Sequence, residues 1–200
     1  NAAGEVFAAL GYEKATVREI CRRADANLAA LNYHFGDKKS VYLEAVKQAH
    51  CEGADSPTWQ FPAEIPAEQK LYLFIEKMME DMLDRESPSW HLELMMREMA
   101  RPTEACAELV HSFIAPKFAL LLGVIDELVP DDVPLSKRHL LAFSVVGQCL
   151  LYRFHRPFGQ LLIGDDEFES LFDVPYLARH ICDLSVHGIR ETAQQWRGEQ

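Results

Sequence analysis

The sequence predicts an all-α protein on two observations. Apolar residues recur at helical spacing through most of the 200 residues, and no convincing strand alternation interrupts them. Ser, Thr, Asp or Asn precedes several of these periodic segments, where a short polar side chain can accept hydrogen bonds from the first free amides of a helix. With 48% hydrophobic residues, the chain can bury a substantial core.

The region from Thr16 to Ser40 predicts two short helices joined by a tight turn. Thr16 and Glu19 form a capping box, which places the start of the first helix at Val17. The Asp-Ala-Asn run that ends at Asn27 breaks this helix, and Asn27 is suited to cap a second helix from Leu28 to about Phe35. Two short helices with a three- or four-residue turn have helix-turn-helix geometry, whose second helix enters the major groove of DNA. The segment therefore predicts a DNA-reading head.

A change of composition after this head predicts a domain boundary. Asp37 can cap a helix from Lys38 to about Cys51, whereas Glu52 to Pro66 contains glycine and three prolines and cannot continue a helix. We therefore expect an N-terminal helix-turn-helix DNA-binding domain at residues 1–51. A C-terminal helical domain is expected at residues 66–200, and the family resemblance given below implies that this domain binds a ligand and dimerises.

The C-terminal region contains several longer amphipathic patterns, each with its own start or stop signal. In chain order we expect a helix with Leu71, Phe74, Ile75, Met78 and Met82 on one face; a helix from Pro88 or Ser89 to Arg101-Pro102; a helix opened by Thr103 and kinked or split at Pro116; a helix capped by Ser136 and running from Lys137 to about Phe154; and a last helix that begins at Asp173–Pro175 and ends near Trp196.

Net charge does not argue against DNA binding once it is divided along the chain. The total is −11, but residues 1–50 hold seven Lys/Arg and six Asp/Glu, whereas residues 51–200 hold thirteen and twenty-five. The acidic residues are thus concentrated outside the helix-turn-helix segment. An acidic body repels DNA except through one face, which favours a defined docking mode over general coating.

The run Leu31-Asn32-Tyr33-His34-Phe35-Gly36-Asp37-Lys38-Lys39 resembles the DNA-binding signature of the tetracycline-repressor (TetR) family of bacterial transcription regulators. Gly11-Tyr12 and the apolar Val6, Phe7 and Leu10 of a preceding helix also match, so the resemblance covers roughly the first fifty residues. One departure is Asp25, where the family usually has Gly in the turn. Asp tolerates left-handed backbone, so we expect the turn to be kept.

Candidate DNA-binding residues follow from the positions of the second helix and its neighbours. Asn32 could bond adenine N6 and N7 in bidentate fashion, and the small or apolar Leu28, Ala29 and Ala30 permit close approach and methyl contact with thymine. The resemblance implies phosphate contacts for Tyr33 and His34. Lys38 and Lys39 lie at a helix N-terminus, a natural phosphate site. The full predicted set is Thr16, Arg18, Asn27, Leu28, Ala29, Ala30, Asn32, Tyr33, His34, Lys38 and Lys39.

The alternative for this segment is that its aromatic residues are core and its charges are solvated. For Leu31 and Phe35 we adopt that interpretation and expect both side chains to be buried. For Asn32, base reading and simple exposure remain open at this stage.

Two segments are apolar almost all round and predict contact with a second copy. Leu140 to Tyr152 is one, and Val174 to Ile189 is the other, with small Ser185 and Gly188 allowing close approach. The resemblance implies a homodimer in which the last two long helices of each copy form a four-helix bundle. A purely intramolecular core is the alternative.

The resemblance also implies a small-molecule effector site in the C-terminal domain. Six methionines lie on two successive helices, and methionine suits adaptable apolar pockets, although plain core is its commoner role. Glu93 and Arg97 are four residues apart and could equally be a surface pair. The candidate ligand-binding residues are Met78, Met82, His91, Met95, Arg97, Met99, Phe113, Phe118, Gln148 and Tyr152.

A second resemblance covers most of the remaining chain. His91 to Pro116, followed by Gly147-Gln148 and Tyr152-Arg153, is similar to the CecR-type effector domain found behind some TetR heads. Together the two resemblances imply a ligand-responsive repressor that a small molecule releases from a palindromic operator, and control of drug-export or drug-sensitivity genes. A helical protein-interaction module without DNA readout is the alternative function.

Other classes of function lack the residues they need. There is no G-x-S-x-G, phosphate-binding glycine loop, H-E-x-x-H or dinucleotide fingerprint, so we expect no enzyme, no cofactor and no metal. The five cysteines are scattered without a C-x-x-C pair and are expected to be reduced. No run of 18 apolar residues and no signal peptide is found, which predicts a cytoplasmic protein. Asn1 already lies inside the first expected helix, so a basic arm before it is a further expectation.

Overall fold

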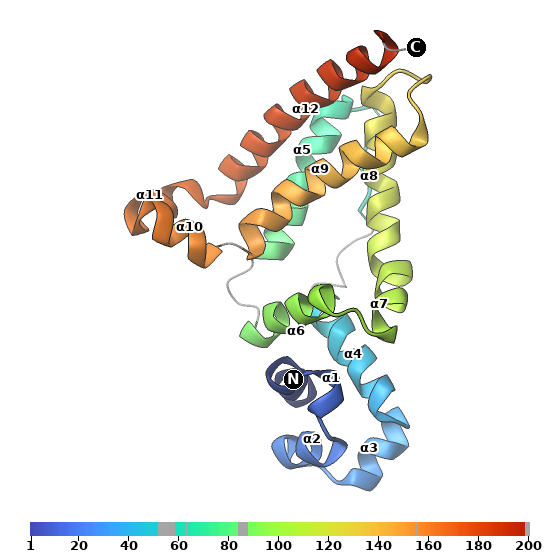
Figure 1. The fold of residues 1–200 in the computed structure, drawn as a ribbon, viewed down its shortest axis with the longest axis vertical. Helices are drawn as coiled ribbons and strands as arrows, with labels where there is room; N and C mark the ends of the chain where they lie inside the picture. The colour runs from blue at the N-terminus through green and yellow to red at the C-terminus, as the bar shows by residue number, and fades with distance from the viewer. Residues whose placement is uncertain (52–58, 63, 84–87, 155, 199–200) are drawn as a thin grey trace. The chain divides into compact units, whose positions relative to one another are not determined.

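The computed structural model describes residues 1–51, 59–62, 64–83, 88–154 and 156–198, and all regular elements in this part of the chain are helical (Figure 1). The chain divides into two compact units, each with its own hydrophobic core. Unit 1 comprises Asn1–Asp55 and Glu86–Ala115. Unit 2 comprises Ser56–Arg85 and Pro116–Gln200. The predicted all-α class is confirmed.

Unit 1 is a cluster of short helices around one core. Helix α1 packs against α2, α4 and α6, while α3 contacts both α2 and α4. The unit contains α1 (Ala2–Lys14), α2 (Val17–Ala24), α3 (Leu28–Phe35), α4 (Lys38–Cys51), α6 (Ser89–Ala100), α7 (Glu104–Leu109) and a π-helical turn (Val110–Ile114).

The capping residues of the head start their helices at the predicted positions. The cap bonds are Glu19 N–H to Thr16 Oγ1 at 3.2 Å, Ala29 N–H to Asn27 Oδ1 at 2.8 Å, and Ser40 N–H to Asp37 Oδ1 at 2.8 Å. Each bond satisfies one of the amides that a helix start leaves free. Asp25 ends α2 in the left-handed conformation at φ +49°, as expected for a turn that a glycine usually makes.

Only half of the predicted capping box forms. The Glu19 carboxylate, which would reach back to the Thr16 amide in a full box, is instead held by Arg22 at 2.6 Å. This pair lowers the pKa of Glu19, with the hydrogen bond from Arg22 as the main cause.

Helices α6 and α7, which lie within the C-terminal domain expected at residues 66–200, pack in unit 1 with the DNA-binding head. The side chain of Trp90 on α6 is buried against α1. A Cβ atom on Gly4 would lie 2.2 Å from the Trp90 ring, so only glycine permits this approach. Amphipathic periodicity predicts that α6 is a helix but does not reveal which core the helix joins.

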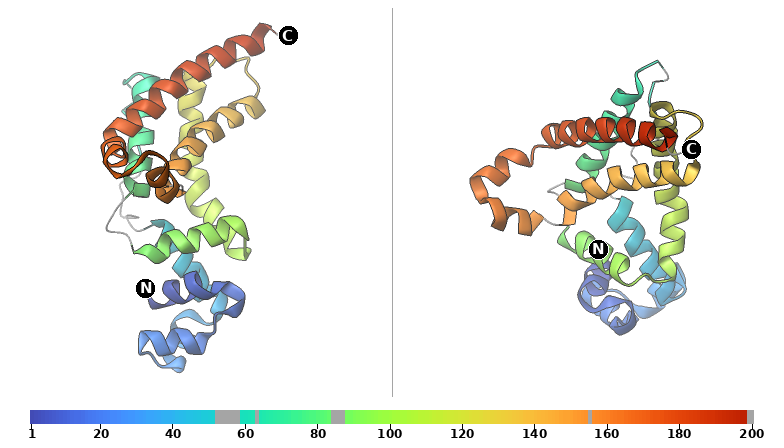
Figure 2. Two further views of the ribbon diagram at one scale, coloured as in Figure 1. Left: turned by 60° about the vertical axis from the view of Figure 1, so that its left-hand side comes forward. Right: turned by 45° about the horizontal axis from the view of Figure 1, so that its top comes forward.

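Unit 2 is built from longer helices. Helix α12 lies along α5 and α9, and α5 also contacts α9 (Figure 2). The helices are α5 (Ala67–Leu83), α8 (Ala115–Leu128), α9 (Leu135–Phe154), α10 (Arg156–Ile163), α11 (Asp165–Leu171) and α12 (Val174–Gly198). The core of this unit includes Leu71, Phe74, Ile75, Leu121, Ile125, Ala142, Val145, Ala178 and Ile181.

One predicted helix bound in unit 2 needs correction, and two agree with the structure. Helix α9 begins at Leu135 and not at Lys137, because the Pro134 carbonyl accepts the amides of Lys137 and Arg138 at 2.9 and 3.1 Å. Asp173 caps α12 as expected, accepting the Tyr176 amide at 3.0 Å. That helix ends at Gly198, near Trp196 as expected.

The run from Glu104 to Leu128 is continuous helix, with the π-helical turn immediately before Pro116 at the place where a kink or split was expected. This run is long and apolar enough to cross a membrane, and it is the one such helix among the described residues. Leu109 is buried in the core of unit 1, and Leu121 and Ile125 are buried in that of unit 2. A core helix of a globular protein has the same composition, so this is weak evidence for a membrane span.

Candidate nucleic-acid interface

Helix α3 exposes almost its whole length. Leu31 is its one buried residue and packs with the core of unit 1, as predicted. Asn32, His34 and Tyr33 lie on the exposed surface, and 86% of Tyr33 is accessible to solvent. A helix that holds one core contact and presents an amide, an imidazole and a phenol is suited to hydrogen bonding with a groove or a phosphate backbone.

The prediction that Phe35 is buried is wrong, because 42% of the residue is exposed. It is the last residue of α3, where the chain leaves the core to turn towards α4. Its ring borders an open groove of about 720 Å³, together with Leu31, Val41 and Ala45.

Lys38 and Lys39 are adjacent at the start of α4 but have different surroundings. The Lys38 ammonium lies 4.5 Å from the centre of the Tyr12 ring and donates to the Glu13 carbonyl at 3.4 Å. Lys39 forms an ion pair with Glu104 of α7, which raises the pKa of Lys39 and lowers that of Glu104. The charge of Lys39 is therefore already balanced, whereas that of Lys38 has no carboxylate partner among the described residues.

The three arginines of α2 also differ. Arg22 pairs with Glu19 at 2.6 Å and Arg23 with Glu5 at 2.5 Å. Arg18 is exposed, and its side chain has no ion pair or hydrogen bond within the described residues. Of the three guanidinium groups, that of Arg18 is the one available for a phosphate contact.

A buried carboxylate behind the head was not predicted from the sequence. Glu98 on α6 is 2% exposed and accepts hydrogen bonds from the Tyr42 hydroxyl at 2.5 Å and the Thr103 amide at 2.7 Å. The Thr103 hydroxyl donates to the same carboxylate at 2.9 Å. Burial, followed by the bond to Glu98, raises the pKa of Tyr42 far above its usual value. This network joins α4, α6 and the start of α7, and so supports the helix that follows the recognition helix.

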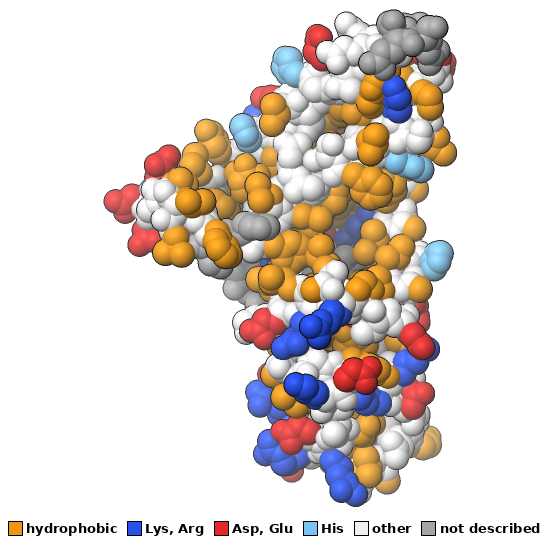
Figure 3. Space-filling view, viewed as in Figure 1, with side chains coloured by type: hydrophobic (Ala, Val, Ile, Leu, Met, Phe, Trp, Pro, Cys, Tyr) orange, Lys and Arg blue, Asp and Glu red, His pale blue; other side chains and the backbone are white. Residues whose placement is uncertain are grey.

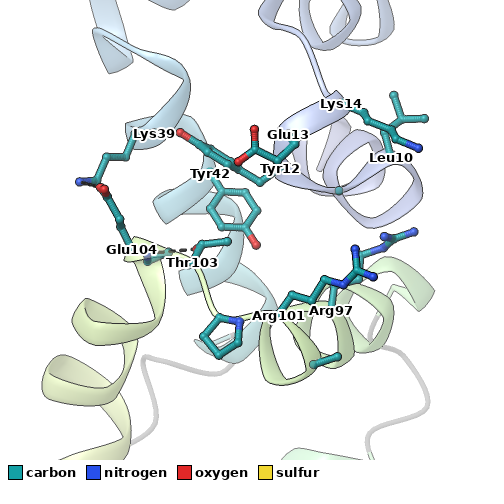
Figure 4. A pocket seen from close by; sticks show the side chains of 14 residues that line it. Leu10, Tyr12, Glu13, Lys14, Lys39, Tyr42, Arg97, Arg101, Thr103 and Glu104 are labelled. Atoms are coloured by element: carbon teal, nitrogen blue, oxygen red, sulfur yellow. Dashed lines mark hydrogen bonds and ion pairs between the residues drawn. The ribbon is translucent and has the colours of Figure 1, made fainter.

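Arg97, a predicted ligand residue, is engaged with α1. Its Nε donates to the Ala8 carbonyl and its Nη2 to the Ala9 carbonyl at 3.0 Å. These carbonyls lose their helical partners because α1 is interrupted at Gly11, whose φ is +76°. Figure 4 shows the cleft beside this contact, with Lys39 and Glu104 on one side and Arg97 and Arg101 on the other. Its volume is about 800 Å³.

The predicted effector residues are divided between the two units. His91, Met95, Arg97, Met99 and Phe113 lie in unit 1, whereas Met78, Met82, Phe118, Gln148 and Tyr152 lie in unit 2. In unit 1, His91 is buried with its ring 4.0 Å from that of Trp90. In unit 2, Gln148 donates to the Ser185 hydroxyl at 3.1 Å, and Tyr152 packs edge-on to Phe172. Several of these side chains therefore have structural contacts that periodicity alone did not predict.

Nothing in the described ranges adds a metal or redox site. No group of three or more His, Cys, Asp or Glu residues in this part of the chain could hold a metal ion. Cys21, Cys149 and Cys182 are buried as free thiols, and Cys106 is half-buried.

A capped helix-turn-helix with an exposed recognition helix, joined to a second helical unit, defines a DNA-binding transcription regulator. The pattern of "Bacterial regulatory proteins, tetR family" matches residues 1–45, and that of "HTH-type transcriptional dual regulator CecR, C-terminal domain" matches residues 67–189. The chain belongs to the TetR family and carries a CecR-type C-terminal domain. It is a transcription regulator and not an enzyme, which decides against a protein-interaction module without DNA readout.

Relatives and solved structures agree with this assignment. The HTH-type transcriptional dual regulator CecR of Shigella flexneri is 27% identical, over 78% of this chain and 74% of the relative. The fold is similar to that of the regulator FadR from Bacillus subtilis in complex with stearoyl-CoA, with a TM-score of 0.64, 16% identity, and coverage of 94% and 95% of the two chains. A putative transcriptional regulator from Pseudomonas aeruginosa PAO1 gives a TM-score of 0.62, 19% identity, and coverage of 97% and 89%.

Proposed function

We propose that this protein is a homodimeric, ligand-responsive repressor that binds a palindromic operator and leaves it when a small molecule binds to unit 2. The observation that carries the proposal is helix α3, which Asn27 caps and Leu31 anchors while its polar side chains stay exposed. One such head recognises a single half-site. Two heads held about 34–36 Å apart by a two-fold axis are needed to read a palindrome.

In the proposed complex, Asn32 reads adenine in the major groove while Leu28, Ala29 and Ala30 lie close to the base edges. All four side chains are exposed on α3. Tyr33, His34, Lys38 and Arg18 contact phosphates on either side of the groove. Thr16 and Asn27 contribute through the helix starts that they cap, where free amides favour a phosphate.

The proposed dimer uses α9 and α12. Leu140 and Phe143 on α9 are 60% and 61% exposed in the single chain, although their sequence context is apolar almost all round. Leu184 on α12 is also exposed. An apolar face of this size on a helix that also contributes to its own core suits a four-helix bundle between two copies.

The proposed effector site lies in unit 2, where Met78, Met82, Phe118 and Tyr152 pack against the core and Gln148 bonds to Ser185. The FadR structure with stearoyl-CoA supports the idea that a fold of this kind can hold a small molecule. The effector must bind more tightly to the DNA-incompetent state, since only differential affinity shifts the equilibrium. Methionine side chains can repack around an apolar ligand at low cost.

The further proposals concern physiology and rest on resemblance. We place the protein in the cytoplasm, and we propose control of genes for drug export or drug sensitivity, as the CecR-type domain suggests. The relative from Shigella flexneri is described as a dual regulator, so activation at some promoters is compatible with the proposed repression.

Selection of bound sequences from random DNA, at several salt concentrations, tests this function. The expected product is an inverted repeat whose affinity falls steeply with salt, because each phosphate contact releases counterions. Drug-like and acyl-thioester compounds are then screened for release of the selected DNA. Absence of any enriched sequence would contradict DNA reading, and an enriched single half-site would contradict the dimer.

A further inference from the structure

We infer that the helical hairpin formed by α10 and α11 is part of the dimer interface and packs against a second copy of this chain. This inference rests on the proposed homodimer and extends it beyond α9 and α12. The term α10 patch is used here for Leu161, Leu162 and Ile163. Leu161 and Leu162 are 86% and 82% exposed, the highest values among the exposed leucines.

One aromatic cluster, centred on the buried Phe168, connects the hairpin to α9. The Phe168 and Phe172 rings on the α11 side stack with centroids 3.7 Å apart, and Phe172 contacts Tyr152 of α9 edge-on at 5.6 Å. A Cβ atom on Gly159 would lie 3.0 Å from the Phe168 ring, so glycine lets α10 approach α11 closely. The α10 patch lies outside this internal packing.

The α10 patch is continuous with the face proposed for dimerisation. Helix α10 comes after α9 in the chain and contacts it, and the hairpin projects beyond the ends of α9 and α12 in the right view of Figure 2. In Figure 3, hydrophobic side chains extend over the hairpin and along α9 on the same side of unit 2. No other described helix of unit 2 contacts α10 extensively apart from α9 and α11.

The exposed apolar area is of the size a dimer needs. The summed exposed area of the large apolar residues on α9, α10 and α12 is at most on the order of 1,000 Å², if each fully exposed side chain contributes roughly 150–200 Å². A standard interface buries about 800 Å² on each partner. The residues are Leu135, Leu140, Phe143 and Leu151 on α9, the α10 patch, and Tyr176 and Leu184 on α12. The α10 patch supplies roughly a third of this area by the same estimate.

The charge beside the α10 patch favours a protein partner of this kind over DNA or a membrane. Asp165, Asp166 and Glu167 occupy the first turn of α11, directly after the patch, and all three are exposed. DNA and anionic lipid would be repelled by these carboxylates. A two-fold interface is self-complementary, so a second copy brings an equivalent apolar face to the same place.

The dimer dissociation constant of the full chain, measured by analytical ultracentrifugation, tests the inference. Leu161→Glu with Leu162→Glu is expected to raise this constant at least 30-fold. The matched control is Ser170→Glu, which adds a charge to the exposed side of α11 and is expected to change the constant less than threefold. If wild type is a dimer and the double variant changes the dissociation constant less than threefold, the role of the hairpin is overturned while the proposed homodimer stands. Wild type that stays monomeric at micromolar concentration would overturn the proposed homodimer, and the inference with it.

Photo-crosslinking makes the test independent of any folding defect in the charged variant. A benzophenone maleimide on Leu161→Cys is expected to capture a second copy, while the same label on Asp166→Cys at the acidic turn captures far less. Unsubstituted protein treated with the same reagent corrects for the native thiols. Equal capture from both positions, or none from position 161, would overturn the inference.

Discussion

Helices α3 and α10 are alike in length and exposure but opposite in chemistry. Each has eight residues, and each has a large hydrophobic residue that is 86% accessible, Tyr33 in α3 and Leu161 in α10. The exposed surface of α3 carries an amide, a phenol and an imidazole. That of α10 carries consecutive aliphatic side chains and is followed by three acids.

Helices α3 and α10 are both available for binding because both are exposed, and the chemistry of their side chains indicates a different partner for each. A polar helix exchanges hydrogen bonds with water for hydrogen bonds with DNA at little cost, and so can be exposed in the free protein. An apolar helix of the same exposure gains by leaving water, which favours a permanent partner.

Glu98→Ala is expected to destabilise unit 1, which contains α3, more than unit 2, which contains α10. The substitution leaves the buried hydroxyl of Tyr42 and the amide of Thr103 without their acceptor, at a cost of about 2–3 kcal/mol. Hydrogen exchange followed by mass spectrometry measures opening in each unit. Glu98→Gln, which retains an acceptor, should restore part of the protection from hydrogen exchange. Equal destabilisation of both units would contradict the prediction that Glu98 supports unit 1 alone.

Asn32→Ala should reduce discrimination between operator variants by about 1–3 kcal/mol at one base position. Asn32 is exposed and is the single amide on the body of α3. Competition binding against a set of operators with one altered base pair gives the measurement. An equal loss of affinity on the operator and on random DNA would rule out base reading by this residue.

Lys38→Ala should weaken binding to all sequences by roughly tenfold and reduce the slope of log affinity against log salt by about one. Lys39→Ala is the matched control, because Lys39 is already paired with Glu104 and should contribute less. Titrations at four salt concentrations measure both slopes. A larger slope change for Lys39→Ala than for Lys38→Ala would show that the ion pair opens on DNA and that our ranking is wrong.

The smallest expected effect concerns the buried thiols of Cys149 and Cys182, which belong neither to α3 nor to α10. Burial raises the pKa of Cys149 to about 12 and that of Cys182 to about 11, so alkylation at pH 8 should modify half-buried Cys106 well before either. An unfolded chain ionises these thiols at lower pH, so stability should fall as pH rises from about 9 towards 11. Site-resolved mass spectrometry and thermal melts at each pH measure the two effects. Early alkylation of Cys149 would contradict its burial.

The starts of α2, α3 and α4 could be predicted because their causes are local. Thr16, Asn27 and Asp37 each bond an amide two or three residues ahead, and Asp25 adopts the left-handed turn on its own. The same reasoning found the cap at Asp173. The exposed DNA-binding candidates on α3 follow from these local signals together with the resemblance to the TetR family.

Features that depend on distant parts of the chain could not be predicted. The carboxylate of Glu98 is buried because Tyr42, 56 residues away, donates to it, and Arg97 reaches the carbonyls of α1 across 89 residues. The hairpin of α10 and α11 was missed because two glycines and a proline make its sequence resemble a loop. Phe35 was misassigned because helical spacing does not say how far the core extends beyond the last turn.

The assignment of α3 as the DNA-reading helix is tested first by a footprinting experiment. The full-length chain is bound to the DNA that flanks its own gene, and the protected bases are mapped. We expect a protected inverted repeat whose half-site centres lie about one helical turn, or a multiple of it, apart. We also expect Leu161→Glu/Leu162→Glu to lose that protection at concentrations where wild type binds. No protected site in these flanks, together with no sequence enriched from random DNA, would contradict the assignment of α3 as the reading helix.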